Sequence, residues 1–161
     1  MSVEFTTMRA AEAAEVTAPD GSSVRPLCVL PRAASFAQFE LAPGQVSKAV
    51  SHGCVQEIWY VVAGGGQMWR GQEGRAEVTA LDAGVCLTIP LGTAFQFRAG
   101  PDGLRVVAAT IPPWPGTPDE ARPERGPWLA DLVSRSGRGT PVSASPPAPS
   151  RPRRTTAASC R

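Results

Sequence analysis

The stretch GQVSKAVSHGCVQEIWYVVAG, residues 44–64, carries the clearest structural pattern of this chain. From Glu57 onward apolar side chains follow one another as in a β-strand, which turns successive residues to opposite faces of a sheet. Residues 57, 59 and 61 then share one face of the strand, and the residues between and after them share the other: Ile58, Tyr60 and Val62. Because both faces are largely apolar, this strand is predicted to lie between an interior cavity and a second covered surface.

Short β-type runs extend on both sides of this strand, from Val24 to Ile111. Glycine, proline and aspartate interrupt them at even intervals, and no helical period lies among them. About nine strands in this arrangement predict an antiparallel sandwich or barrel, so the expected fold class is all-β. Turns are predicted at Pro43-Gly44, residues 64–66, residues 82–84, residues 90–92 and residues 100–103.

The segments that flank this region have a different composition. Residues 1–23 are predicted to form an N-terminal extension, of which residues 5–18 are weakly helical at best. Residues 135–161 consist mainly of Pro, Ser, Ala, Gly and Arg, which leave almost no large apolar side chain to bury, so they predict a disordered tail. The folded domain is therefore expected to span residues 24–134.

The last part of this domain is rich in proline and tryptophan. Six prolines between Pro112 and Pro127 exclude regular structure. Trp114 and Trp128 would be costly to leave in water, so the segment is predicted to pack on the strands as an ordered strap. A short helix at residues 128–134 is expected to close the domain.

The charge of the chain excludes several classes of partner. Sixteen basic and 14 acidic residues give a net charge of +2, of which residues 131–161 carry +5 and residues 1–130 carry −3. A mildly acidic folded part without a helix-turn-helix pattern predicts no nucleic-acid partner. No apolar run reaches the length of a signal peptide or a membrane span, so we expect no membrane partner and a cytoplasmic location.

Two motifs with defined spacing lie among the strands. The first, residues 44–64, has the form G-x7-H-x4-E-x6-G and is anchored by Gly44, His52, Glu57 and Gly64. The second, GVCLTIPLGTAFQFRA at residues 84–99, has the form G-x5-P-x-G and is anchored by Gly84, Pro90 and Gly92.

Together the two motifs resemble those of the cupin superfamily, G-x5-H-x-H-x4-E-x6-G and G-x5-P-x-G-x2-H-x3-N. The resemblance implies a cupin-type jelly-roll β-barrel whose outer face is covered by a homodimer partner or an N-terminal strand. In typical cupins three histidines and one glutamate bind a divalent iron, manganese, nickel or zinc ion. Here Val50 stands at the first histidine, Phe95 at the last and Ala99 at the asparagine.

Only His52 and Glu57 therefore remain of the four ligand positions. A metal ion held for catalysis generally needs about three protein ligands, so the sequence predicts a cavity without a metal cofactor. A divalent iron, manganese, nickel or zinc ion bound by His52, Glu57 and unconventional ligands is the alternative.

His52 is the one histidine of the chain, and the resemblance aims Glu57 at the same cavity. The two side chains are candidates for a catalytic acid–base pair, in which Glu57 orients or charges the imidazole. They are equally compatible with a structural remnant, in which the buried carboxylate and the imidazole satisfy each other and loss of one would leave the other without a hydrogen-bond partner.

The remaining inward-facing residues predict an apolar pocket with one polar corner. Beside the pair, the expected ligand-binding residues are Val50, Trp59, Val61, Met68, Phe95 and Phe97. Such a pocket suits a small, largely apolar organic molecule better than a free sugar or phosphate. Arg70 and Arg98 are candidates to meet a ligand carboxylate at the rim.

Three functions stay open at this point. The first is metal-independent acid–base catalysis of the isomerase, epimerase, dehydratase or cyclase type, with His52 and Glu57 as catalytic residues. The second is a metal-dependent cupin dioxygenase or isomerase with an incomplete ligand set. The third is a non-catalytic ligand-binding or regulatory barrel.

Overall fold

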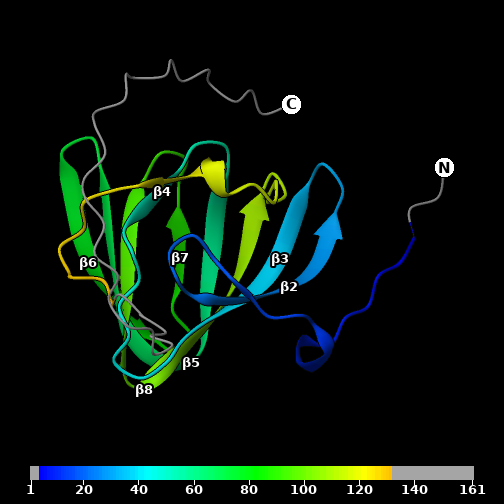
Figure 1. The fold of residues 1–161 in the computed structure, drawn as a ribbon, viewed down its shortest axis with the longest axis horizontal. Helices are drawn as coiled ribbons and strands as arrows, with labels where there is room; N and C mark the ends of the chain where they lie inside the picture. The colour runs from blue at the N-terminus through cyan, green and yellow to red at the C-terminus, as the bar shows by residue number, and fades with distance from the viewer. Residues whose placement is uncertain (1–3, 132–161) are drawn as a thin grey trace, which may run out of the picture. The chain divides into compact units, whose positions relative to one another are not determined.

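The computed structural model describes residues 4–131, which form one antiparallel sheet of nine strands that curls on itself (Figure 1). The strands are β1 (Val16–Thr17), β2 (Ser23–Leu30), β3 (Ala34–Leu41), β4 (Val50–His52), β5 (Gln56–Gln72), β6 (Arg75–Asp82), β7 (Cys86–Ile89), β8 (Ala94–Ile111) and β9 (Ala121–Pro123). Two single 3₁₀ turns, η1 (Ala10–Glu12) and η2 (Pro118–Glu120), are the helical elements of this part of the chain. The predicted all-β class is confirmed.

Two long strands, β5 and β8, join the two halves of the curled sheet. In one half the order is β1-β2-β3-β8-β5-β7, and in the other it is β9-β4-β8-β5-β6. β5 and β8 pair with each other along almost their whole length and belong to both halves. The interior between the halves therefore lies against both of these strands.

Two predicted turns are wrong, because β5 and β8 run without a break from one half of the sheet to the other. Residues 64–66 and residues 100–103 lie inside the continuous strands β5 and β8, and do not reverse the chain. The register shifts between Val61 and Ala63 and between Gly64 and Gly66 mark bulges at this corner. Glycine and proline here bend a strand, as they do at barrel corners, and a sequence pattern does not distinguish such a bend from a turn.

Glycine is required at the corner because the two backbones approach closely. A Cβ atom on Gly66 would overlap the carbonyl oxygen of Arg98, and one on Gly64 would overlap that of Gly103. Gly64 also has a φ of +72°, which favours glycine. The predicted reversals at residues 43–44, 82–84 and 90–92 are turns in the structure.

The alternation predicted for β5 is confirmed. Glu57, Trp59 and Val61 are buried, whereas the side chains between them are exposed. The inner residues of β5 and β8 join those of the other strands in one hydrophobic core, which includes Leu81, Phe97 and Val106. One face of β5 therefore lines the interior from which the site is built.

The proline-rich strap lies on the strands, as its tryptophans indicate, but the prediction that it lacks regular structure is wrong at β9, which pairs with β4 along the edge of the sheet. The Gln96 side chain is buried and holds the strap, because its Nε2 donates to the backbone oxygen of Trp128 (2.9 Å) and its Oε1 accepts from the Trp128 N–H (3.1 Å). Arg98 stacks on the Trp128 ring, with its guanidinium carbon 4.5 Å from the ring centroid. Residues 128–131 show no helical turn, and the rest of the helix predicted for residues 128–134 lies outside the described residues, as does the tail predicted for residues 135–161.

The predicted N-terminal extension, residues 1–23, contributes to the sheet where the structure describes it. β1 pairs with β2, and Ala13, Asp20 and Ser22 are buried. None of the helical elements in residues 4–131 has the length and apolar character that a membrane-spanning helix needs. The cytoplasmic location stays a prediction.

We expect Gly66→Ala to destabilise the fold by about 3 kcal/mol or more, because the new methyl group has no space against the β8 backbone. Gly100→Ala is the matched control at the same corner, since its Cβ would lie 3.3 Å from the nearest atom, the Gly65 oxygen. The control should cost less than about 1 kcal/mol in chemical denaturation. Equal losses for the two variants would contradict the close approach of β5 and β8.

Candidate functional site

The central side chain of the site is His52, at the end of β4. β4 lies between β8 and β9, with Val50 opposite Phe95 on β8 and His52 opposite Ala121 on β9. The imidazole is 8% exposed and packs between two aromatic rings. The Phe95 ring centroid is 5.3 Å away, and Trp114 presents its ring at 76° with a centroid distance of 5.4 Å.

Glu120, which comes from the strap, holds the imidazole in place. Its Oε2 lies 2.7 Å from His52 Nδ1, and its Oε1 accepts hydrogen bonds from the backbone N–H groups of Cys54 (2.9 Å) and Val55 (3.2 Å). The Glu120 backbone oxygen accepts from the Gly53 N–H (3.1 Å). These donors compensate the burial of the carboxylate. Because the carboxylate accepts a hydrogen bond from Nδ1–H, the other ring nitrogen, Nε2, carries the lone pair and faces the interior.

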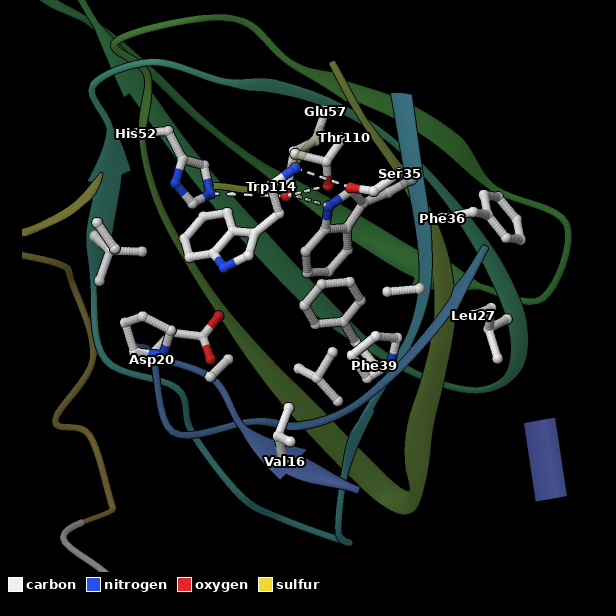
Figure 2. A pocket seen from close by; sticks show the side chains of 18 of the residues that line it. Val16, Asp20, Leu27, Ser35, Phe36, Phe39, His52, Glu57, Thr110 and Trp114 are labelled. Carbon is white, nitrogen blue, oxygen red and sulfur yellow. Dashed lines mark hydrogen bonds and ion pairs between the residues drawn. The ribbon is translucent and has the colours of Figure 1, made fainter. Parts of the chain in front are cut away.

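Glu57 lies on the other side of the imidazole, at the start of β5. Its Oε1 is 3.7 Å from His52 Nε2 and accepts from the Thr110 hydroxyl (3.2 Å). Its Oε2 accepts from the Trp59 indole N–H (2.6 Å). Figure 2 shows His52, Glu57 and Thr110 gathered at one end of the pocket.

Burial raises the pKa of Glu57 above its ordinary value of 4.5. The interaction with His52 and the hydrogen bonds from Trp59 and Thr110 oppose the rise, and the nearby charge of Asp20 adds to it. The surroundings therefore favour the protonated carboxyl more than water does.

A cavity of about 250 Å³ opens beside this cluster, with mostly apolar walls. Phe39 and Trp59 stack on one wall with ring centroids 5.5 Å apart, and the lining also includes Phe36, Phe95 and Trp114. Strands β1 and β2 and the loop between them supply another wall through residues 16–20, Val24 and residues 26–29. The size suits a small organic molecule.

Asp20 is a second buried carboxyl at this cavity, and it comes from the loop between β1 and β2. Burial raises its pKa above the ordinary value of 3.8, against the hydrogen bonds from Ser22 and the charges of His52 and Lys48. Because each of Asp20 and Glu57 responds to the charge of His52, the three groups share one electrostatic environment.

The structure brings five of the eight predicted site residues to the cavity: Val50, His52, Glu57, Trp59 and Phe95. The other three, Val61, Met68 and Phe97, do not line it and pack in the core. They are buried inward as predicted, but they lie further along the β5–β8 pair, where Phe97 meets the Trp59 ring edge to face and Met68 pairs with Phe97.

The two arginines expected at the rim are engaged elsewhere. Arg70 donates to the Thr88 backbone oxygen (2.6 Å) and pairs with Glu77, and Arg98 donates to Gln67 (2.9 Å). Neither lines the cavity.

Sequence reasoning missed Asp20, Glu120 and Trp114 as parts of this site. Asp20 precedes Gly21 and reads as an ordinary turn residue, and Glu120 lies in a proline-rich segment without periodicity. The cost of leaving Trp114 in water was the one available signal, and it pointed to burial but not to His52.

The residues at the four cupin ligand positions do not fit a metal ion. Val50 and Phe95 are apolar neighbours across β4 and β8, and Glu120 occupies one nitrogen of His52. Within residues 4–131 no group of three or more His, Cys, Asp or Glu side chains is arranged to hold a metal ion. The absence of a metal cofactor stays a prediction, which metal analysis of the purified protein can test.

Comparison with solved structures identifies the fold. One similar structure is that of the Streptomyces protein Pac13, a nucleoside dehydratase, in the form of a variant solved with uridine. It superposes on this chain with a TM-score of 0.61 at 15% sequence identity, and the match covers 76% of this chain and 93% of Pac13. Oxalate decarboxylase from Bacillus subtilis superposes with a TM-score of 0.59 at 16% identity, covering 69% of this chain and 30% of that enzyme. Both are cupin β-barrels, so the predicted cupin fold is confirmed.

At the level of sequence, no protein-family model matches the chain. No curated protein matches it either.

We expect Glu57→Gln to change how stability depends on pH. The folded wild type keeps the Glu57 proton at pH values where the unfolded chain has released it, so this group costs stability as the pH rises above 4.5 until the raised pKa is passed. The free energy of unfolding of the variant, relative to wild type, should therefore increase over this range in urea titrations. Glu73→Gln, in the exposed turn between β5 and β6, controls for loss of a surface carboxylate. Parallel pH curves for Glu57→Gln and wild type would contradict the raised pKa.

Proposed function

We propose that this cupin-fold protein is a metal-independent acid–base enzyme that acts on a small, largely apolar organic molecule, with a dehydratase or isomerase reaction as the best fit. The observation that carries the proposal is the bond between His52 Nδ1 and the Glu120 carboxylate, 2.7 Å long, which leaves Nε2 directed toward Glu57 and the cavity. A buried imidazole held this way is a general base with one reactive nitrogen.

His52 Nε2 takes the first step as the base. With Nδ1–H donated to Glu120, the neutral ring presents the Nε2 lone pair to a substrate in the cavity. A carbon acid next to a carbonyl group transfers its proton to Nε2, and the Glu120 carboxylate at Nδ1 stabilises the imidazolium that forms. Phe95 and Trp114 hold the ring plane and limit access of water.

Glu57 is the matching acid, because burial raises its pKa. In a dehydration, the C–H electron pair forms the new double bond, and the hydroxide that leaves the β-carbon takes the Glu57 proton and departs as water. The imidazolium proton then restores the acid. In an isomerisation, the same proton returns to a different carbon or face, so both reactions use one pair of residues.

The comparisons favour dehydration within this class. Pac13, which shares the fold over most of its length, is a nucleoside dehydratase. The metal-dependent alternative has the weaker support, because the ligand positions at 50 and 95 are apolar. The non-catalytic barrel predicts binding without turnover, which the following experiment detects.

The test uses a panel of small cyclic ketones and β-hydroxy ketones in D₂O, with deuterium incorporation and water loss followed by NMR. We expect turnover that persists in EDTA and falls by roughly 10²–10⁴-fold in His52→Gln. Glu120→Gln should also lower the rate, because the ring loses the carboxylate that orients it and stabilises its charged form. Glu124→Gln is the matched control, since this strap carboxylate bonds Ser51 and does not contact His52.

Loss of activity in EDTA would favour the metal-dependent reading. A His52→Gln rate equal to that of wild type would contradict the assignment of the base. Saturable binding of panel members without exchange or water loss would favour the non-catalytic barrel.

The outer face of the sheet supports a homodimer as part of this proposal. Ile58, Tyr60 and Val62 are 44%, 48% and 44% exposed, and the neighbouring Phe36 on β3 extends the same apolar face through Ala109. A contiguous apolar surface of this kind is typical of a protein interface.

We expect the wild type to be dimeric and Ile58→Glu/Tyr60→Glu to be monomeric in light-scattering measurements at micromolar concentration. Val78→Glu is the control, because Val78 is 52% exposed on β6 and lies in the other half of the sheet. A monomeric wild type would contradict the homodimer.

A further inference from the structure

Asp20 places in the cavity a buried carboxyl that the proposed reaction does not use. The side chain is 6% exposed and lies on the wall formed by the loop between β1 and β2. Its Oδ1 accepts hydrogen bonds from the N–H (2.8 Å) and the hydroxyl (2.6 Å) of Ser22. Among residues 4–131, no hydrogen bond is made to its other oxygen, Oδ2.

A carboxylate oxygen in an apolar cavity is costly unless a donor meets it. Ser22 fixes the orientation of Asp20 through Oδ1, so Oδ2 keeps one direction. Figure 2 shows Asp20 at the pocket, away from the end where Glu57 and Thr110 lie. Oδ2 is therefore available to accept from a donor group of a ligand bound in the cavity.

The charges around the cavity define what kind of donor fits. Asp20 and Glu57 line it, and Glu120 lies behind His52. No lysine or arginine belongs to its described lining. Lys48 is exposed and lies outside the lining; its N–H donates to the Asp20 carbonyl (2.8 Å), and its charge, like that of His52, lowers the pKa of Asp20 against the larger effect of burial. An anionic ligand would meet two carboxyl groups of the lining without a lysine or arginine beside them, whereas a cationic ligand would complete the charge balance there.

The aromatic lining favours the same charge. Phe39 and Trp59 form a stacked pair at the cavity, and Trp114 presents a further indole. Aromatic faces attract organic cations, and the attraction is stronger in a desolvated site.

We propose that the cavity selects small ring-containing molecules that carry a protonated amine, and that Asp20 is the residue that binds this ammonium group. The inference rests on the proposed function for the identity of the cavity as the substrate site, and it adds the charge class of the substrate. Asp20 thereby fixes one end of the molecule, while His52 and Glu57 act at the other.

Three probes of the same ring test the inference: benzylamine, benzyl alcohol and benzoate, which carry an ammonium, a hydroxyl and a carboxylate at neutral pH. Calorimetry on the full chain should show benzylamine binding at least about tenfold more tightly than benzyl alcohol, because a charge-assisted hydrogen bond is roughly twice as strong as a neutral one. Benzoate should bind most weakly.

Asp20→Asn is the deciding variant, because Asn keeps the oxygen that accepts from Ser22 and loses the charge. Benzylamine affinity should fall at least about tenfold, while benzyl alcohol affinity should stay within about threefold, which also verifies that the cavity is intact. Asp102→Asn, at an exposed position of β8, makes the same change in net charge away from the cavity and should leave all three affinities unchanged.

Equal affinities of wild type for benzylamine and benzyl alcohol would overturn the proposal. So would a preference for benzylamine that survives in Asp20→Asn, or the absence of benzylamine binding. His52→Gln should keep the amine preference, so a failure of the catalytic assignment leaves this result standing. Turnover that depends on His52 without any amine preference would overturn the role of Asp20 alone.

Discussion

The hydrogen bond between the His52 imidazole and the Glu120 carboxylate is the constraint on which the site depends. It joins β4 to a segment 68 residues later, and both side chains are buried. A buried carboxylate is tolerated only when donors surround it, and here the turn after β4 supplies two backbone N–H groups besides the imidazole. The strap, the turn and the histidine are therefore stabilised as one unit, and loss of one member leaves a buried polar group without its partner.

The fold could be predicted from the sequence because it rests on local patterns. Two-residue alternation placed Trp59 and Val61 inside and Tyr60 outside, and the two motifs pointed to a cupin-type barrel. The bends at residues 64–66 and residues 100–103 cannot be told from turns in the sequence, because glycine permits both and only the pairing of β5 with β8 decides between them.

The site could be predicted only in part, for the same physical reason. His52 and Glu57 lie at motif positions, so their meeting follows from the strand arrangement. Glu120 and Asp20 reach the cavity from irregular segments, where no periodicity fixes the direction of a side chain. Their contribution depends on contacts between distant parts of the chain. The pair predicted from sequence is therefore the inner part of a larger group of ionisable residues.

Glu120 follows strands β1 to β8 in the sequence, and this order has a consequence for biosynthesis. A ribosome delivers the chain from its N-terminus, so β1 to β8 can leave the exit tunnel before the strap does. Until the strap docks, the imidazole of His52 has no carboxylate on Nδ1 and no Trp114 ring against it. The nascent barrel can thus acquire its shape before the imidazole of His52 acquires its orientation, which is fixed only when the strap docks.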